Sequence, residues 1–483
     1  MTGLGHSKLF IVLLFCAATA IAASAQTFTT IADFPFSEGV DPDAPLVEGV
    51  NGNLFGTTVA GGSSSHCRLD GRPYGCGTVF QVTTGGTLTA VHRFDDSDGA
   101  VPGGLAQAVN GTLLGTTFYG GASSAGTVFK IGSTGKLTTL YNFCSQTNCI
   151  DGRYPTSRLV LGANGNYYGA TYGGGANQSG SVFEITSDGI LTTLYSFCSQ
   201  ANCIDGSGPG LLGLASSGNF YGVTASGGAN TGGTVFEITP GGKLSTIYSF
   251  CSRTNCADGE QPTALVQAAD ATFYGITYQG GANSGGTVFE ITPKGRLQTL
   301  YSFCAQTSCA DGASPNGLIQ ATDGNFYGTT SAGGLSGNWG TIFEISSTGT
   351  LTTLHQFCSQ SNCGDGAVPQ AGLMQATNGI LYGTTGEGGS CYCGSIFSLS
   401  LGLGPFVETL PGFGSAGEVV GILGSDLKGT TSVSFNGTPA TNFTVMSETV
   451  VKAIVPTGAT TGMIEVSTPS GTLLSNLPFR IVR

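Results

Sequence analysis

Gly233-Thr-Val-Phe-Glu-Ile-Thr239 closes a unit of about 53 residues that recurs seven times along this 483-residue chain. In the same unit, residues 190–197, 211–214 and 220–224 are short runs rich in apolar, aromatic and β-branched residues, separated by Gly, Asn and Pro. Runs of this kind predict four antiparallel strands joined by turns. Four strands repeated at a period near 50 are typical of the blade of a β-propeller.

The number and phase of the units predict how the body closes. We expect an all-β fold, a seven-bladed β-propeller over residues 26–402; the alternative is a linear β-solenoid, which needs end caps that we do not find. The first unit begins with a single strand, 28–34, and the last ends at 394–399 without one. Residues 28–34 are therefore predicted to complete the last blade. The Gly-Thr-Val-Phe motif or a near copy begins at Gly77, Gly126, Gly180, Gly233, Gly286, Gly340 and Gly394.

Aromatic residues recur beside glycine in most units. A Tyr-Gly pair precedes the Gly-Gly loop, and a phenylalanine ends each Gly-Thr-Val-Phe. Glycine beside an aromatic residue permits close backbone approach. We expect these rings to pack between blades, with ligand stacking as the alternative. The tyrosines are Tyr168, Tyr221, Tyr274, Tyr327 and Tyr382.

The two ends of the chain differ from the repeats. Residues 1–25 read as a secretory signal: Lys8 is followed by apolar residues 9–18, and Ala23-Ser-Ala25 offers small residues at the cleavage site. A buried helix, a retained anchor and lipoprotein processing at Cys16 are the alternatives. After residue 402 the repeat stops, and short alternating strands over 403–483 predict a small β-sandwich.

Charge limits the classes of partner. The formal net charge is −12 and only 9% of residues are charged. Nucleic acids and anionic membranes attract clustered Lys and Arg, so neither is an expected partner. No second apolar run of 18 residues follows the signal, so we expect no transmembrane segment in the mature chain, which is expected to be monomeric.

Cysteine spacing follows the repeat. Without Cys16 fourteen cysteines remain, and pairs in phase with the fold predict disulfides and export to an oxidising compartment, the periplasm, the cell surface or the medium. Zinc is the alternative, but it needs four ligands, and the chain has four scattered histidines. Crosslinks between Cys67/Cys76 and Cys391/Cys393 are an alternative to local pairing. The predicted pairs are Cys144/Cys149, Cys198/Cys203, Cys251/Cys256, Cys304/Cys309, Cys358/Cys363, Cys67/Cys76 and Cys391/Cys393.

The most repeated polar residue is the aspartate of Asp-Gly-x-x-Pro. Aspartate accepts backbone hydrogen bonds in turns, so its presence in every unit favours a structural role; the alternative is calcium or a polyhydroxylated ligand. The lone tryptophan, Trp339, lies in a Gly-rich loop, where it either packs under the loop or stacks on a sugar. The aspartates are Asp98, Asp151, Asp205, Asp258, Asp311 and Asp365, with Asp41-Pro-x-x-Pro45 taken as the first copy.

The ordered motifs Leu-Tyr-Ser-Phe, Asp-Gly-x-x-Pro, Gly-Asn-Phe-Tyr-Gly and Gly-Thr-Val-Phe-Glu-Ile resemble the GloVer tandem repeat of secreted and envelope-associated bacterial proteins, over residues 27–400. That family is named for its choice of surface anchors, and we expect none here because the chain ends at Arg483 without a sorting segment. The resemblance implies no reaction. Residues 403–483, with Gly-Ser-Asp-Leu-Lys-Gly and Val-Pro-Thr-Gly-Ala-Thr-Thr-Gly, resemble an IPT/TIG domain, an immunoglobulin-like fold that acts as a spacer or contact domain.

These observations favour a non-catalytic protein that binds an extracellular glycan or protein through the loops of one face. No Ser-His-Asp set, nucleophile elbow or phosphate loop is evident. The rival is an enzyme, a polysaccharide hydrolase or lyase, whose acids would come from distant blades. Glu260 and Glu387, acids of single units, would be the first to test. We expect no cofactor.

Overall fold

The computed structural model describes residues 26–62, 67–69, 72–132, 134–156, 158–335 and 337–482. Strands and short 3-10 turns are its only regular elements over those residues. The predicted signal, residues 1–25, lies outside them. No helix in the described part is long and apolar enough to cross a membrane.

One repeat forms one four-stranded antiparallel sheet, as its sequence predicts. In the fourth sheet the order is β17 (Ser207–Leu214), β18 (Phe220–Ser226), β19 (Thr234–Ile238) and β20 (Leu244–Ser249). The side chains of Val235 and Phe236 in β19 are fully buried, because both faces of this strand are covered by protein. Strand β20 is half-exposed and lies at the outer edge.

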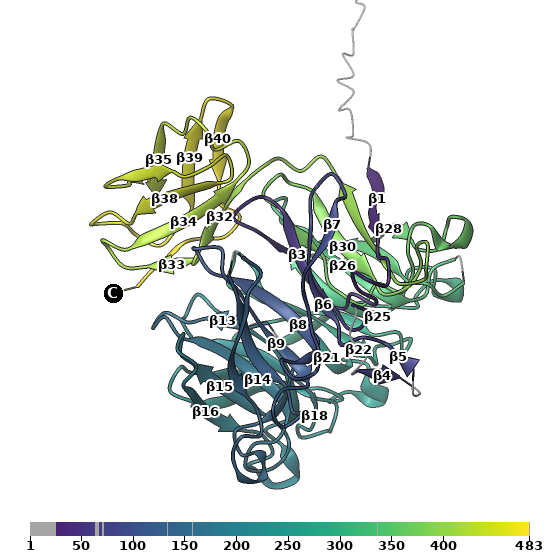
Figure 1. Cartoon of the computed structure of the whole chain (residues 1–483). Coiled ribbons are helices and arrows are strands. Elements are labelled where there is room, and N and C mark those ends of the chain that lie inside the picture. The colour runs from purple at the N-terminus through teal and green to yellow at the C-terminus, as the bar shows by residue number, and fades with distance from the viewer. Residues whose placement is uncertain are drawn as a thin grey trace, which may run out of the picture.

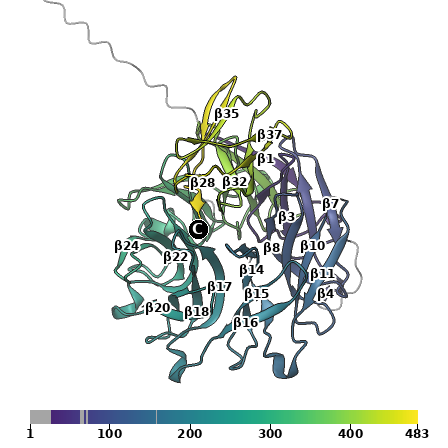
Figure 2. The ribbon, with the colours of Figure 1, turned by 90° about the vertical axis from the view of Figure 1, so that its left-hand side faces the viewer.

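The other repeat sheets follow the same pattern, and the third has a fifth short strand. In Figures 1 and 2 the sheets stand side by side around a common centre. Their strands are β2 (Val47–Glu48), β3 (Leu54–Thr58), β6 (Thr78–Val82) and β7 (Leu88–Arg93); β8 (Ala100–Gln107), β9 (Leu113–Tyr119), β10 (Thr127–Ile131) and β11 (Leu137–Asn142); β12 (Arg153–Pro155), β13 (Val160–Leu161), β14 (Tyr167–Gly173), β15 (Ser181–Ile185) and β16 (Leu191–Ser196); β21 (Glu260–Gln267), β22 (Phe273–Gln279), β23 (Thr287–Ile291) and β24 (Leu297–Ser302); β25 (Ala313–Gln320), β26 (Phe326–Ala332), β27 (Thr341–Ile345) and β28 (Leu351–Gln356). The hairpin β4 (Arg68–Leu69) and β5 (Arg72–Pro73) lies between β3 and β6.

The first strand of the chain completes the last repeat sheet. Strand β1 (Thr27–Asp33) pairs antiparallel with β31 (Ser395–Ser400), next to β30 (Leu381–Thr385) and β29 (Met374–Gln375). The register runs from Thr27 opposite Ser400 to Asp33 opposite Ser395. The sequence prediction that residues 28–34 join the last unit is confirmed.

Consecutive sheets pack through the recurring aromatic rings. Tyr221 lies against Phe273 of the next sheet with ring centroids 4.2 Å apart, and Tyr168 stacks on Phe220 at 4.1 Å. Gly222, which follows Tyr221, has no room for a side chain: a Cβ there would lie 2.6 Å from the ring of Phe236. The prediction that these aromatic residues pack between units is confirmed.

The loops divide the repeat body into two faces. The Asp-Gly loops and the Gly-Gly loops lie together, as when the amide of Gly281 donates to the carbonyl of Cys256 (2.9 Å); we call this side the loop face. The opposite side, which carries only tight turns such as that at Gly218, is the plain face. Single 3-10 turns follow the outer strand in five loops: η1 (Thr147–Cys149), η2 (Ala201–Cys203), η3 (Thr254–Cys256), η4 (Thr307–Cys309) and η5 (Ser361–Cys363).

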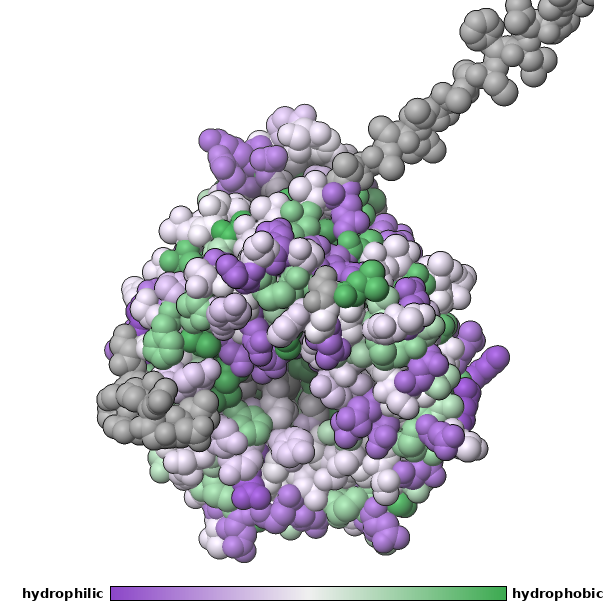
Figure 3. Space-filling model, turned by 90° about the vertical axis from the view of Figure 1, so that its right-hand side faces the viewer, coloured by the Kyte–Doolittle hydropathy of each residue, from purple (hydrophilic) through white to green (hydrophobic). Residues whose placement is uncertain are grey.

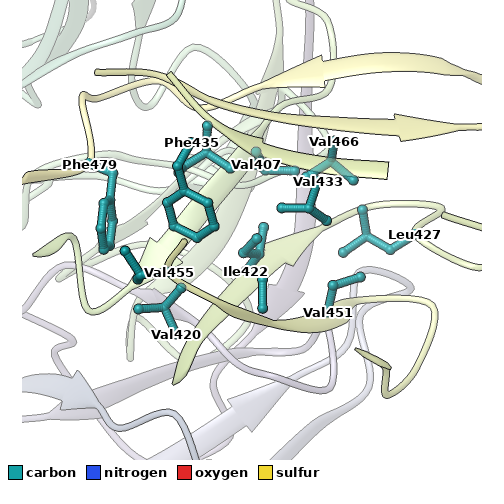
Figure 4. Packing of buried hydrophobic residues seen from close by; sticks show 12 residues of the cluster. Val407, Val420, Ile422, Leu427, Val433, Phe435, Val451, Val455, Val466 and Phe479 are labelled. Carbon is teal, nitrogen blue, oxygen red and sulfur yellow. The ribbon is translucent and has the colours of Figure 1, made fainter. Parts of the chain in front are cut away.

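Residues after Leu403 form two further four-stranded sheets with their own core (Figure 4). The rings of Phe435 and Phe479 pack edge to face at 5.2 Å, with Ile422 and Val451 beside them. The strands are β32 (Val407–Leu410), β34 (Val419–Gly424), β38 (Val450–Ile454) and β37 (Phe443–Val445) in one sheet, β36 (Thr438–Pro439), β35 (Ser432–Phe435), β39 (Ile464–Thr468) and β40 (Gly471–Leu474) in the other, and the parallel pair β33 (Phe413–Gly414) and β41 (Arg480–Ile481). We call residues 404–482 the C-terminal module.

Candidate functional site

The repeated aspartates hold the loops that follow the outer strands. Asp205 is fully buried, and its Oδ2 accepts hydrogen bonds from the Tyr195 hydroxyl (2.8 Å) and the Ser199 amide (2.9 Å). Its Oδ1 accepts from the amide of Gln200 (3.3 Å). These bonds satisfy the carboxylate and support the turn interpretation over calcium or ligand contact. Asp151, Asp258, Asp311 and Asp365 are buried with equivalent partners.

The same loops carry the disulfides. Each C-x4-C pair is joined across a 3-10 turn, and the turn places two residues, such as Asn202 and Cys203, in the left-handed region. Cys67 pairs with Cys76 and Cys391 with Cys393, locally rather than across sheets. Glu260 approaches the sulfurs of Cys251 and Cys256, but disulfide sulfurs do not act as thiolate ligands, so these residues form no metal site. The remaining bonds join Cys144 to Cys149, Cys304 to Cys309 and Cys358 to Cys363.

In the first repeat, the residue at the position of the repeated aspartate differs from the one that the sequence predicted. Its copy of Asp-Gly-x-x-Pro is Glu38-Gly39-Val40-Asp41-Pro42, so Glu38, and not Asp41, takes the aspartate position. The Thr78 hydroxyl donates to the carbonyl of Glu38 (2.7 Å), as the Thr127 hydroxyl does to that of Asp98 (3.3 Å). The alignment of Asp41-Pro-x-x-Pro45 was wrong because the motif tolerates the longer acid, and a second proline three residues on imitates the pattern.

Asp41 instead belongs to a ring of seven residues, each directly before the proline of its motif. All seven have left-handed backbone, with φ between 51° and 63°. The amide of each donates to a carbonyl of the preceding sheet, as Asp41 does to Cys393 (3.0 Å) and Tyr154 to Ala125 (2.8 Å). The backbone is thus repeated while the side chain is free to differ. We call these the rim positions: Asp41, Val101, Tyr154, Gly208, Gln261, Ser314 and Val368.

At the second and third sheets the rim carries an aromatic pocket. Tyr119 and Tyr172 are 47% and 51% exposed, although both are large apolar side chains. Phe118 stacks on Tyr154 with centroids 5.1 Å apart, and Tyr119 meets the Tyr154 ring edge to face at 5.3 Å. The pocket is open to solvent and has a volume of about 320 Å³, at the lower end of the range of small-ligand sites. Its polar lining is Arg153, Gln178, Ser179 and Ser207.

Figure 3 looks onto a side of the molecule that is hollowed near its middle, with apolar and polar side chains mixed around the hollow. Such surfaces suit amphipathic ligands with apolar faces and polar edges.

The predicted ligand residues do not gather in this pocket. Trp339, in the sixth repeat, packs against the cluster that includes Tyr327 and Phe357. Asp98 is part-exposed and pairs with His92 (2.7 Å). The aromatic pocket was missed from sequence because its residues occupy repeated positions at which only their identity is unusual.

Acids gather at the first and last repeats. Asp41 accepts a hydrogen bond from the Gln370 amide nitrogen (2.8 Å), and burial, with the charges of Asp43 and Glu387 adding, raises the pKa of Asp41 to about 6. Glu387, a single-unit acid noted in the sequence, thus lies near the rim.

The C-terminal module packs on the plain face. The Thr449 hydroxyl donates to the carbonyl of Val50 (2.7 Å), and the amide of Phe406 to the carbonyl of Thr377 (2.9 Å). Burial, with the charge of Glu48 adding, raises the pKa of Glu408 to about 7, and the charge of Arg158 opposes this rise. The module therefore meets the repeat body through charged groups as well as turns.

Comparison with known proteins gives a family but no activity. The model of the Gloeobacter/Verrucomicrobia repeat matches residues 67–257 and 208–446. No curated protein matches the chain. Among solved structures, a fungal alcohol oxidase in complex with copper has a TM-score of 0.49 at 15% identity, over 95% of this chain and 99% of that one.

Two bacterial structures are similar to the same degree. The extracellular domain of a hybrid two-component system from Bacteroides thetaiotaomicron has a TM-score of 0.49 at 12% identity, over 95% of this chain and 60% of that one. A puromycin-hydrolysing peptidase of Mycobacterium tuberculosis has a TM-score of 0.47 at 12% identity, over 81% of this chain and 59% of that one.

Proposed function

As the chain belongs to the Gloeobacter/Verrucomicrobia repeat family, we propose that it is an exported, non-catalytic protein that binds an extracellular glycan at the aromatic pocket of its loop face. In this proposal the repeat sheets are the blades of a seven-bladed β-propeller, and the C-terminal module is an IPT/TIG immunoglobulin-like domain. Residues 1–25 are removed as a signal peptide.

The observation that carries the proposal is the pair of exposed tyrosines, Tyr119 and Tyr172, set beside the ring of Tyr154. Exposed aromatic faces stack on the apolar face of a sugar ring, while serine and glutamine side chains bond its hydroxyls. Ser207 and Gln178 line the same pocket. The disulfides and the absence of a membrane-spanning helix from the described residues fit a protein that works outside the cell.

A glycan array with residues 26–483, produced with oxidised disulfides, tests the proposal. We expect binding to a subset of oligosaccharides and a loss of about tenfold in Tyr172→Ala, because stacking of a sugar on the exposed ring would contribute about 1.5 kcal/mol. Tyr278→Ala is the matched control, because Tyr278 occupies the same place two repeats on, outside the pocket lining. Equal losses in both variants, or binding only to proteins, would overturn the assignment.

The rival function is a polysaccharide hydrolase or lyase. The raised pKa of Asp41 beside Asp43 and Glu387 favours it, since glycosidases use paired carboxylates with separated pKa values. Product release from polysaccharides that disappears in Asp41→Asn would establish the rival, and binding without products would reject it.

A further inference from the structure

We propose that the aromatic pocket recognises a sugar that bears a carboxylate, a uronic acid, through the guanidinium of Arg153. This inference rests on the proposed glycan binding and specifies its chemical class. Arg153 begins β12 beside the stacked rings, and it is the only charged side chain among the described residues that line the pocket.

No acidic side chain among the described residues pairs with Arg153. Its Nε is buried without a hydrogen-bond partner among the described residues, and none of their carboxylates lies within 4.0 Å of its guanidinium. Arg93, in contrast, pairs with Glu38 at 2.8 Å. Arg253 and Arg296 also have no acid within 4.0 Å, so what distinguishes Arg153 is its buried Nε without a hydrogen-bond partner among the described residues.

The neighbours of Arg153 hold it in the pocket. Its guanidinium carbon lies 5.2 Å from the centroid of the Tyr154 ring, a cation–π contact. Gly173 is its partner in the register of β12 and β14, and a Cβ at that glycine would lie 3.1 Å from the Arg153 Nε. The equivalent residue of other sheets carries a side chain, such as Tyr119 or Glu387. An arginine and the glycine that makes room for it therefore occur together in one repeat.

The chemistry of arginine selects the ligand group. Its planar guanidinium presents parallel N–H donors that match the two oxygens of a carboxylate. In the pocket, the Arg153 guanidinium lies beside aromatic rings and the hydroxyl of Ser207. A sugar ring with an exocyclic carboxylate is the ligand that uses all three at once.

Matched ligands separate this inference from the proposed function. Tetragalacturonate and the same tetramer with its carboxylates methyl-esterified are titrated into the whole protein, Arg153→Gln, Arg153→Lys and Arg253→Gln. Arg253 is the control, an exposed arginine of a cysteine loop on the same face. Near-UV circular dichroism verifies that each variant keeps its packing.

We expect the whole protein to prefer the free acid on the order of tenfold, as for a charge-assisted hydrogen bond. Arg153→Gln loses that preference, Arg153→Lys keeps part of it, and Arg253→Gln keeps all of it. Equal binding of acid and ester by the parent, or a stronger response to sulfated or phosphorylated oligosaccharides, overturns the inference while leaving glycan binding intact. Binding to no oligosaccharide overturns the proposed function as well.

Discussion

The five cysteine loops and the rim positions lie on the same face and differ in what repetition has retained. In the loops both backbone and side chains recur: the buried aspartate, its tyrosine or histidine partner and the disulfide are near copies. At the rim only the left-handed backbone and its hydrogen bond to the preceding sheet recur, while the side chain changes from Asp41 to Tyr154 to Gly208. In our proposal the loops stabilise the body and the rim carries recognition.

The largest expected effect comes from removing a repeated carboxylate. Asp258→Ala leaves the amides of Ser252 and Arg253 and the Tyr248 hydroxyl without their acceptor, which we expect to lower the free energy of unfolding by about 3 kcal/mol. Asp98→Ala, at a part-exposed copy without a disulfide, should cost about 1 kcal/mol. Thermal unfolding of both variants measures the difference, and equal losses would contradict the structural role.

Removal of a disulfide should cost less. Cys251→Ser with Cys256→Ser opens a ring of six residues, for which loop entropy predicts a loss of about 2 kcal/mol at most. The aspartate of that loop keeps its bonds, so we expect the fold to persist. Retained glycan binding with a lowered melting temperature is the expected result, and loss of binding would show that the loops also recognise ligand.

The plain face offers a smaller effect that depends on pH. The pKa of Glu408 is about 7 in the folded protein and near 4.5 when unfolded, so the unfolded chain releases its proton first and stability falls as pH rises from about 4.5 to about 7. Glu408→Gln, which keeps the neutral form, should be more stable than the parent at pH 8, on the order of 1 kcal/mol, and equal to it at pH 4.5. Melting temperatures across this range, with exposed Glu465→Gln as control, test the sign.

The smallest effect on stability is expected at the rim. Gly208→Asn places there a side chain that tolerates left-handed backbone, as Asp41 does at the rim position of the first repeat, so we expect a cost below about 1 kcal/mol. Its Cβ would lie 2.9 Å from the Tyr172 ring, which must move. Glycan affinity should therefore fall while the melting temperature changes little; the opposite outcome would place recognition elsewhere.

Most of the fold could be predicted from the sequence because the same strand pattern recurs seven times. Strand runs, disulfide pairs and the pairing of residues 28–34 with the last unit all follow from phase, and a repeated signal outweighs local ambiguity. The pocket could not be predicted in this way, because it depends on Arg153, Tyr154 and Gly173, which differ from the residues at the same positions of the other repeats. An alignment of the repeats on the proline of Asp-Gly-x-x-Pro shows these differences. The same alignment assigns Glu38, and not Asp41, to the aspartate position of the first repeat.

The way the C-terminal module packs on the repeat body could not be predicted from the sequence either. It depends on single residues far apart in the chain, such as Glu48, Arg158 and Glu408, whose proximity is a product of the finished fold. No motif marks them, and each alone reads as an ordinary charged residue.

The pairing of β1 with β31 constrains the order in which the parts of the chain can fold. Its two strands are separated by nearly the whole repeat region, so this contact is the slowest of all to find, and synthesis must reach residue 400 before it can form. Until β1 pairs with it, β31 presents an unpaired edge to its surroundings. At high concentration we therefore expect the amino-terminal strand of a second copy to fill that edge in a fraction of molecules and to give exchanged dimers.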